Sequence, residues 1–200
     1  MYPIFPNYGY YPQNYSIISG CINKSKLKLI NHIRMLWEQH ITWTRIVIMS
    51  IVHNLPDTQL NIERLLRNPI DFQKTLVPFY GNRIALRFKD LLADHLTIAA
   101  ELVNAAKSGN KQAAADAEKR WYANANEIAA FLGSINPYWS QQDWKNMLNE
   151  HLSMTKSEAV DMLTQNYNAS IEIYDEIERQ ALKMADVMAN GIIRQFPVMV

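Results

Sequence analysis

Three histidines take matching places in three segments whose apolar residues recur every three or four positions. His40, His95 and His151 each stand in such an apolar stripe, and each lies near the middle of its segment. An imidazole buried without a partner is costly, and a divalent metal ion is a partner that several neutral imidazoles can share. The residue types and their positions therefore indicate a metal site inside a helical protein.

Carboxylates are expected at a similar depth. Residues equidistant from the turn of an antiparallel hairpin lie at equal height, because a helix rises about 1.5 Å per residue. By this measure Asp175 and Glu178 share a layer with the histidines, and Glu158 follows His151 by two helical turns on the same face. We expect the three histidines and one carboxylate to bind Zn²⁺, Mn²⁺, Fe²⁺ or Ni²⁺, with an open position for chemistry such as metal-assisted hydrolysis or thiol transfer.

The alternative is that these histidines are core residues bonded to a neighbouring carbonyl or carboxylate. In that case we expect a non-catalytic structural or assembly protein. A third reading is a binder of a small organic ligand. The sequence names no catalytic residue, and His32 and His53 lie near the ends of their segment, where surface or structural roles are expected.

The apolar stripes predict an all-α protein. Period-3.6 patterns predict long helices over residues 26–54, 82–107, 111–132, 140–165 and 168–195. Residues 57–81 read as a long crossover with a short helix near 59–67, broken at Asn68-Pro69. We therefore expect an up-and-down helical bundle of four to five long helices with one long crossover after the first.

A weak internal repeat accompanies this pattern. Residues 91–96 (LLADHL) match residues 147–152 (MLNEHL), and residues 37–41 (WEQHI) echo both. The repeat suggests that the helix pair over 82–132 and the pair over 140–195 are two versions of one hairpin.

Composition limits the class of protein. Twenty basic and 19 acidic residues give a net charge of +1, which does not favour a nucleic-acid partner. The longest apolar run is too short for a membrane span, and no signal peptide is evident, so we expect a cytoplasmic protein. Residues 1–22 are rich in Tyr and Pro and predict a flexible tail, a candidate contact for an assembly partner or for a second copy. Residues 23–200 then form a single helical domain, and Cys21 is the only cysteine.

The sequence lacks the residues that several known classes of site require. A ferritin-like di-iron centre needs Glu-x-x-His on two helices, but Leu92 and Leu148 stand where those glutamates belong. No Gly-rich phosphate loop or dinucleotide fingerprint occurs, so no nucleotide cofactor is expected.

The chain resembles an uncharacterised helical family of spore-forming Gram-positive bacteria. The resemblance covers residues 37–197 and rests on these segments: 37–45 (WEQHITWTR), 78–81 (PFYG), 121–124 (WYAN), 135–138 (INPY), 150–152 (EHL) and 195–197 (QFP). Members often carry the label acetylglutamate kinase, which this chain does not support because it lacks a phosphate loop and alternating strands. The resemblance implies a helical bundle and supplies no established activity, and it would associate the structural or assembly alternative with the spore coat. The three histidines are also similar, by analogy, to those of DinB-like bundles, which present three histidines to a divalent metal.

Overall fold

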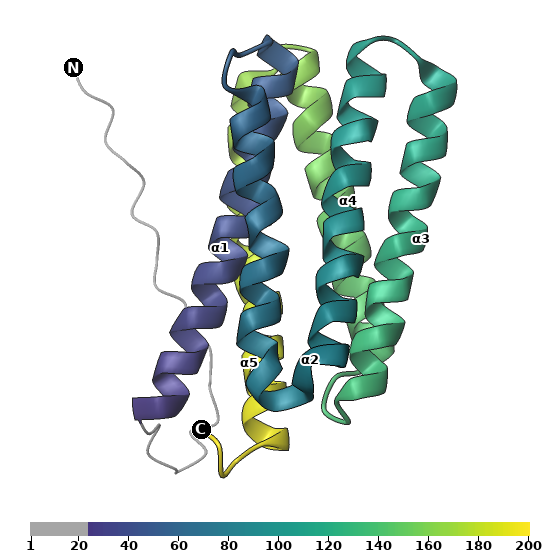
Figure 1. Ribbon diagram of the computed structural model, residues 1–200. Coiled ribbons are helices and arrows are strands. Elements are labelled where there is room, and N and C mark those ends of the chain that lie inside the picture. The colour runs from purple at the N-terminus through teal and green to yellow at the C-terminus, as the bar shows by residue number, and fades with distance from the viewer. Residues whose placement is uncertain (1–23) are drawn as a thin grey trace, which may run out of the picture.

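The computed structural model describes residues 24–200, which form five helices and no strand (Figure 1). The predicted tail over residues 1–22 and Cys21 lie outside the described residues. The helices are α1 (Lys24–His53), α2 (Thr58–Lys107), α3 (Lys111–Ile135), α4 (Gln141–Leu163) and α5 (Tyr167–Gln195). The prediction of an all-α helical bundle is confirmed.

Helix α2 consists of two helices joined at Gly81. This residue has φ 75° and ψ 168°, a backbone conformation that only glycine adopts readily. The first segment of α2 (residues 58–80) and the second segment (residues 82–107) therefore run in opposite directions, as Figure 1 shows. The six helical segments make three antiparallel hairpins.

Residues 57–81 were predicted as a crossover with only a short helix near 59–67. That prediction is wrong, because nearly all of this segment is helical. Pro69 and Pro78 lie inside the helix, where each removes a backbone donor and is normally destabilising by about 3 kcal/mol. The apolar face of this segment compensates, since Leu65, Phe72 and Leu76 are buried at 4 %, 1 % and 0 % exposure. Tertiary packing has overridden the local signal of the prolines.

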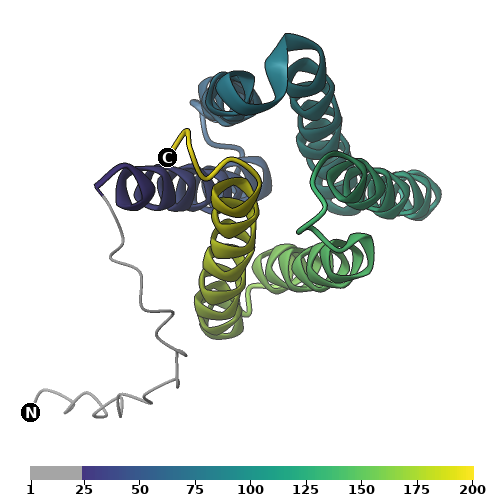
Figure 2. The same ribbon diagram turned by 90° about the horizontal axis from the view of Figure 1, so that it is seen from below.

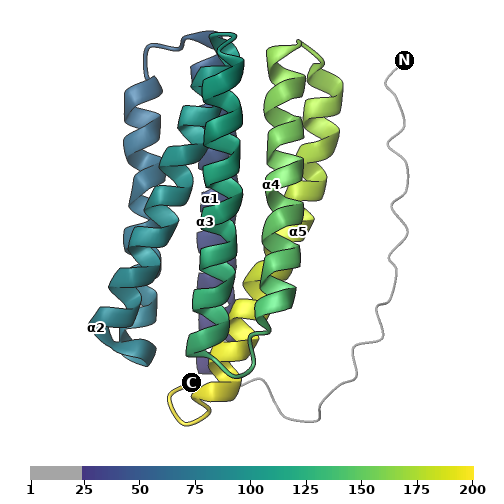
Figure 3. The ribbon, with the colours of Figure 1, turned by 90° about the vertical axis from the view of Figure 1, so that its right-hand side faces the viewer.

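The six segments stand in a ring, which Figure 2 shows from below. Helix α1 packs against α5 and the first segment of α2, α4 packs against α5 and α3, and α3 closes the ring against α2. Neighbouring segments alternate in direction (Figure 3). As a result α1, the second segment of α2 and α4 all run the same way, and these are the three segments that carry the buried histidines.

Two local features fix the open end of the hairpin that α4 and α5 form. The side chain of Ser140 accepts a hydrogen bond from the backbone N–H of Asp143 and so caps α4, as its residue type predicts. At the same end of the α4–α5 hairpin, a β-carbon added to Gly191 would lie 1.8 Å from Nε1 of Trp139, so α5 and the loop before α4 approach each other as closely as glycine allows.

Among the helices within residues 24–200, none combines the length and the apolarity that crossing a membrane requires.

Candidate three-histidine centre

His40, His95 and His151 meet at mid-height in the centre of the ring. Each is 3 % exposed, and all three line one internal cavity of about 10 Å³. The ring centroids of His40 and His151 are 5.8 Å apart. Such a volume suits a single water molecule or ion, so the cavity is the size of a one-atom site.

Each histidine is held by a side-chain amide from the other helix of its own hairpin. Nδ1 of His40 lies 3.4 Å from Oδ1 of Asn68, and Nδ1 of His95 lies 2.8 Å from Oδ1 of Asn124. Nδ1 of His151 lies 3.2 Å from Oε1 of Gln180. All three amides are buried, at 0 %, 8 % and 7 % exposure respectively.

The amides are themselves fixed by the histidine helices. Asn68 donates to the carbonyl of Leu36 at 2.9 Å, Asn124 to that of Leu91 at 3.0 Å, and Gln180 to that of Met147 at 2.7 Å. Each accepting carbonyl belongs to the residue four positions before the histidine. One hydrogen-bonding unit, made of a histidine, an amide and a carbonyl, is therefore repeated three times.

This unit selects one tautomer of each imidazole. Because the amide nitrogen donates to the carbonyl, the amide oxygen faces the ring, and an oxygen of this kind can only accept. The hydrogen of the neutral ring must then sit on Nδ1, which leaves Nε2 with a free lone pair. Since Nδ1 is taken by the amide, Nε2 is the nitrogen left to serve the cavity.

The spacing in the sequence follows from the hairpins. The histidine and its amide are 28 residues apart in the first unit and 29 in the other two. Successive histidines are 55 and 56 residues apart. Equal arms on either side of each turn bring the paired residues to one height. The internal repeat thus has three copies. Residues 24–80 form the first copy, in which the sequence pattern predicted only α1 as a long helix.

Burial keeps the three imidazoles neutral. It lowers the pKa of His40 from 6.5 to about 4, an effect that the hydrogen bond to Asn68 opposes. Burial, and then the neighbouring charge of His40, lower the pKa of His95 to about 3. The pKa of His151 falls to about 3 for the same reasons, with His95 adding to the effect. Neutral imidazole is the form that binds a metal.

Aromatic and aliphatic side chains form the wall of the cavity. Trp37 packs edge-on against His40, and Trp37 also stacks on Trp144. Both tryptophans line the cavity, and neither indole N–H has a hydrogen-bond partner among the described residues. Two buried indole N–H groups without an acceptor among the described residues therefore belong to side chains that line the cavity.

The carboxylates expected beside the histidines do not line this cavity. Glu158 is buried, but it forms an ion pair with Arg45 of α1, which also donates to the carbonyl of Ser170 at 3.0 Å. Asp175 is exposed. Glu178 is half-buried, and its charge helps burial to raise the pKa of Glu38. The structure brings the three histidines together and leaves these three acids apart from them.

The histidines are near one another but not at ligand spacing. Within residues 24–200, no group of three or more His, Cys, Asp or Glu side chains is close enough to hold a metal ion as it stands. A metal would have to draw the imidazoles inward, and the small cavity between them gives the direction of that movement.

Sequence reasoning missed the amides. Asn68 precedes a proline and reads as a helix break, while Asn124 and Gln180 are polar residues at helix positions that carry no motif. The signal that could have found them is the recurrence of an amide residue 28 or 29 positions after each of the three histidines.

In comparisons with protein-family models, curated proteins and solved structures, nothing matches this chain.

Proposed function

We propose that His40, His95 and His151 bind one divalent metal ion through their Nε2 atoms at the centre of the ring. The observation that carries the proposal is the threefold hydrogen-bonding unit. Histidine ligands of metals almost always donate their other ring N–H to an oxygen acceptor, which fixes the tautomer and the orientation of the ring. Here three buried histidines that face one cavity all have such an acceptor on Nδ1.

The amides also bear on the charge of the site. A carboxylate acceptor would add negative charge, whereas Asn68, Asn124 and Gln180 are neutral. Three neutral imidazoles would leave the full charge of a divalent ion in an apolar surrounding, and a site of this kind favours an anionic further ligand. Zn²⁺, Mn²⁺, Fe²⁺ and Ni²⁺ are the candidate ions, since imidazole suits each of them.

The remaining coordination position is the place for chemistry. Three protein ligands and one open position are typical of catalytic rather than structural zinc sites. With Glu158, Asp175 and Glu178 away from the cavity, no carboxylate among those expected fills that position. We therefore propose a catalytic or ligand-binding metal centre, with metal-assisted hydrolysis or group transfer as the reaction class.

The required movement is small for one pair of rings. Two imidazoles that bind Zn²⁺ at about 2.0–2.1 Å with a tetrahedral angle have ring centroids about 5 Å apart. The centroids of His40 and His151 are 5.8 Å apart. His95 approaches from the second segment of α2.

The test is elemental analysis of the untagged, full-length protein after incubation with Zn²⁺, Mn²⁺, Fe²⁺ and Ni²⁺ in turn. We expect about one metal ion per chain, and none in a His95→Ala/His151→Ala double variant. A His32→Ala/His53→Ala double variant is the matched control, because these two histidines are exposed and should not affect binding. A His95→Gln variant serves if the double variant does not fold, since it keeps a polar side chain of similar volume.

Binding to the folded state alone should also raise thermal stability. At a free metal concentration of 100 times Kd the gain is about 2.7 kcal/mol. If the wild-type protein takes up no metal from any of the four ions and its melting temperature does not change, the proposal fails. The histidines are then a polar network of the core, as the alternative of a structural or assembly protein requires.

A further inference from the structure

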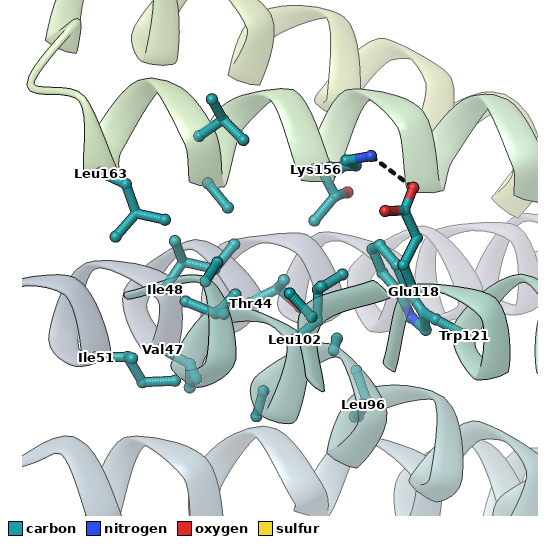
Figure 4. Close-up of a pocket in the computed structure, with 18 of the residues that line it drawn as sticks. Thr44, Val47, Ile48, Ile51, Leu96, Leu102, Glu118, Trp121, Lys156 and Leu163 are labelled. Atoms are coloured by element: carbon teal, nitrogen blue, oxygen red, sulfur yellow. Dashed lines mark hydrogen bonds and ion pairs between the residues drawn. The ribbon is translucent and has the colours of Figure 1, made fainter. Parts of the chain in front are cut away.

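A second cavity lies on the other side of the histidine layer. It has a volume of about 300 Å³ and opens between α1, the second segment of α2, α3 and α4. Figure 4 shows the side chains of these helices pointing into it, with Leu96 and Trp121 toward one end and Ile51 and Leu163 toward the other. Its size is at the lower end of the range for small-molecule sites.

The wall of this cavity is almost wholly apolar. Aliphatic side chains such as Val47, Ile48 and Leu102 supply most of it, and a series of alanines on α2, α3 and α4 leaves the space open. At its mouth apolar side chains are exposed: Ala106 and Ala115 face solvent, and Val160 is 47 % exposed. Exposed apolar side chains that lead into an apolar cavity are typical of a ligand entry.

The floor of the cavity is made next to the histidines. Thr44 and Thr155 stand one turn after His40 and His151, and their hydroxyls donate to the carbonyls of those histidines at 2.8 and 2.9 Å. Because both hydroxyls are engaged by the backbone, they present their methyl groups as apolar surface. From this floor to Leu163 is about two helical turns, or roughly 11 Å.

The charges at the rim favour an anion. Lys156 forms an ion pair with Glu118 at 2.5 Å across the gap between α4 and α3 (Figure 4). Lys111 also lines the cavity and has no ion-pair partner among residues 24–200. It stands at the start of α3, where the helix dipole adds positive potential. The rim therefore has one uncompensated positive charge.

We propose that this cavity binds a single hydrocarbon chain that ends in a carboxylate. The chain lies along the apolar wall, and the carboxylate stays at the mouth near Lys111. The length of the cavity suits a chain of medium length. The proposal is independent of the metal centre, because the cavity and the histidine layer have different walls.

The test is calorimetric titration of the full-length, chelator-treated protein with dodecanoate below its micelle concentration. We expect saturable binding of about one molecule per chain. Dodecyltrimethylammonium has the same chain and the opposite head charge, and it should bind about two- to fivefold more weakly, which is the contribution of an exposed ion pair. Lys111→Glu should weaken dodecanoate binding by a similar factor.

A matched pair of variants locates the site. Ala115→Trp places a large side chain in the mouth and should weaken binding at least tenfold, whereas Ala113→Trp, at an exposed position of the same helix outside the cavity, should not. Equal binding by the two variants, no saturable binding of dodecanoate, or equal affinity for the cationic chain would each overturn the proposal. Because no metal is present, these outcomes are separate from any result on the metal centre.

Discussion

The metal-free protein should lose stability steeply in mild acid. The perturbation is a change from pH 7 to pH 5, which protonates His40, His95 and His151 in the unfolded chain but not in the folded one. In the folded state burial lowers the pKa of His40 to about 4 and those of His95 and His151 to about 3. A lowered histidine pKa stabilises the folded state above pH 6.5, and this contribution is lost as the pH falls toward 4 and 3.

The size of the effect follows from these values. At pH 5 an unfolded histidine with a pKa of 6.5 is almost fully charged, so each buried histidine lowers the free energy of unfolding by about 2 kcal/mol. The three together give about 6 kcal/mol. Glu158 acts in the opposite direction: burial raises its pKa from 4.5 to about 7, so its protonation stabilises the folded state by about 2 kcal/mol at pH 5. The net loss is about 4 kcal/mol, a large part of the stability of an ordinary domain.

The assay is urea unfolding of the chelator-treated protein at both pH values. A Glu158→Gln variant should show a larger fall, of about 6 kcal/mol, because the opposing contribution is removed. Nitrogen NMR of the imidazoles at pH 5 gives an independent readout, in which His40, His95 and His151 should be neutral with hydrogen on Nδ1. A fall below about 1 kcal/mol, or three rings that titrate near their ordinary pKa, would refute the reasoning from burial.

Three further predictions concern single residues. Asn124→Leu removes the acceptor of His95 and should weaken metal binding about 10- to 100-fold in an equilibrium titration against a chelator, while the fold is retained by circular dichroism. Gly191→Ala places a β-carbon against Trp139, and the free energy of unfolding in urea should fall by about 1–3 kcal/mol. Gly81→Ala forces alanine into a backbone conformation close to glycine's own, and the same assay should show a loss of about 1–3 kcal/mol although the space around Gly81 is open. An unchanged metal affinity of Asn124→Leu would show that the amide does not support a ligand. Unchanged stability of Gly191→Ala would show that α5 can move away from the loop, and unchanged stability of Gly81→Ala would show that the turn can relax.

The apolar period made most of the fold predictable. Helices α1, α3, α4 and α5 and the second segment of α2 begin and end within about three residues of the predicted positions, because each stripe ends at a turn signal that the structure uses. The depth estimate also came close. It placed Glu178 at the height of the histidines, and the structure pairs His151 with Gln180, two residues further along α5.

The features that could not be predicted from the sequence depend on contacts between helices. Asn68-Pro69 is a strong local break, and only packing against α1 makes the segment helical. The choice of carboxylates as partners followed from their charge, but the acids on α5 fall on its outer side while Gln180 faces inward. The ion pair of Glu158 with Arg45 joins residues 113 positions apart, and no periodic pattern indicates it.

The glycine turn within α2 has a topological consequence. The start of α1 and the end of the chain lie at the same end of the ring, as does the turn between the two segments of α2 (Figure 1). The order of the three hairpins is therefore cyclic. A circular permutant that opens at Gly81, with a short linker from Val200 to Lys24, would keep every hairpin contact and change only which two neighbours are covalently joined. In such a chain the ring would be specified by its three equivalent units, and the order in which they are synthesised would be interchangeable.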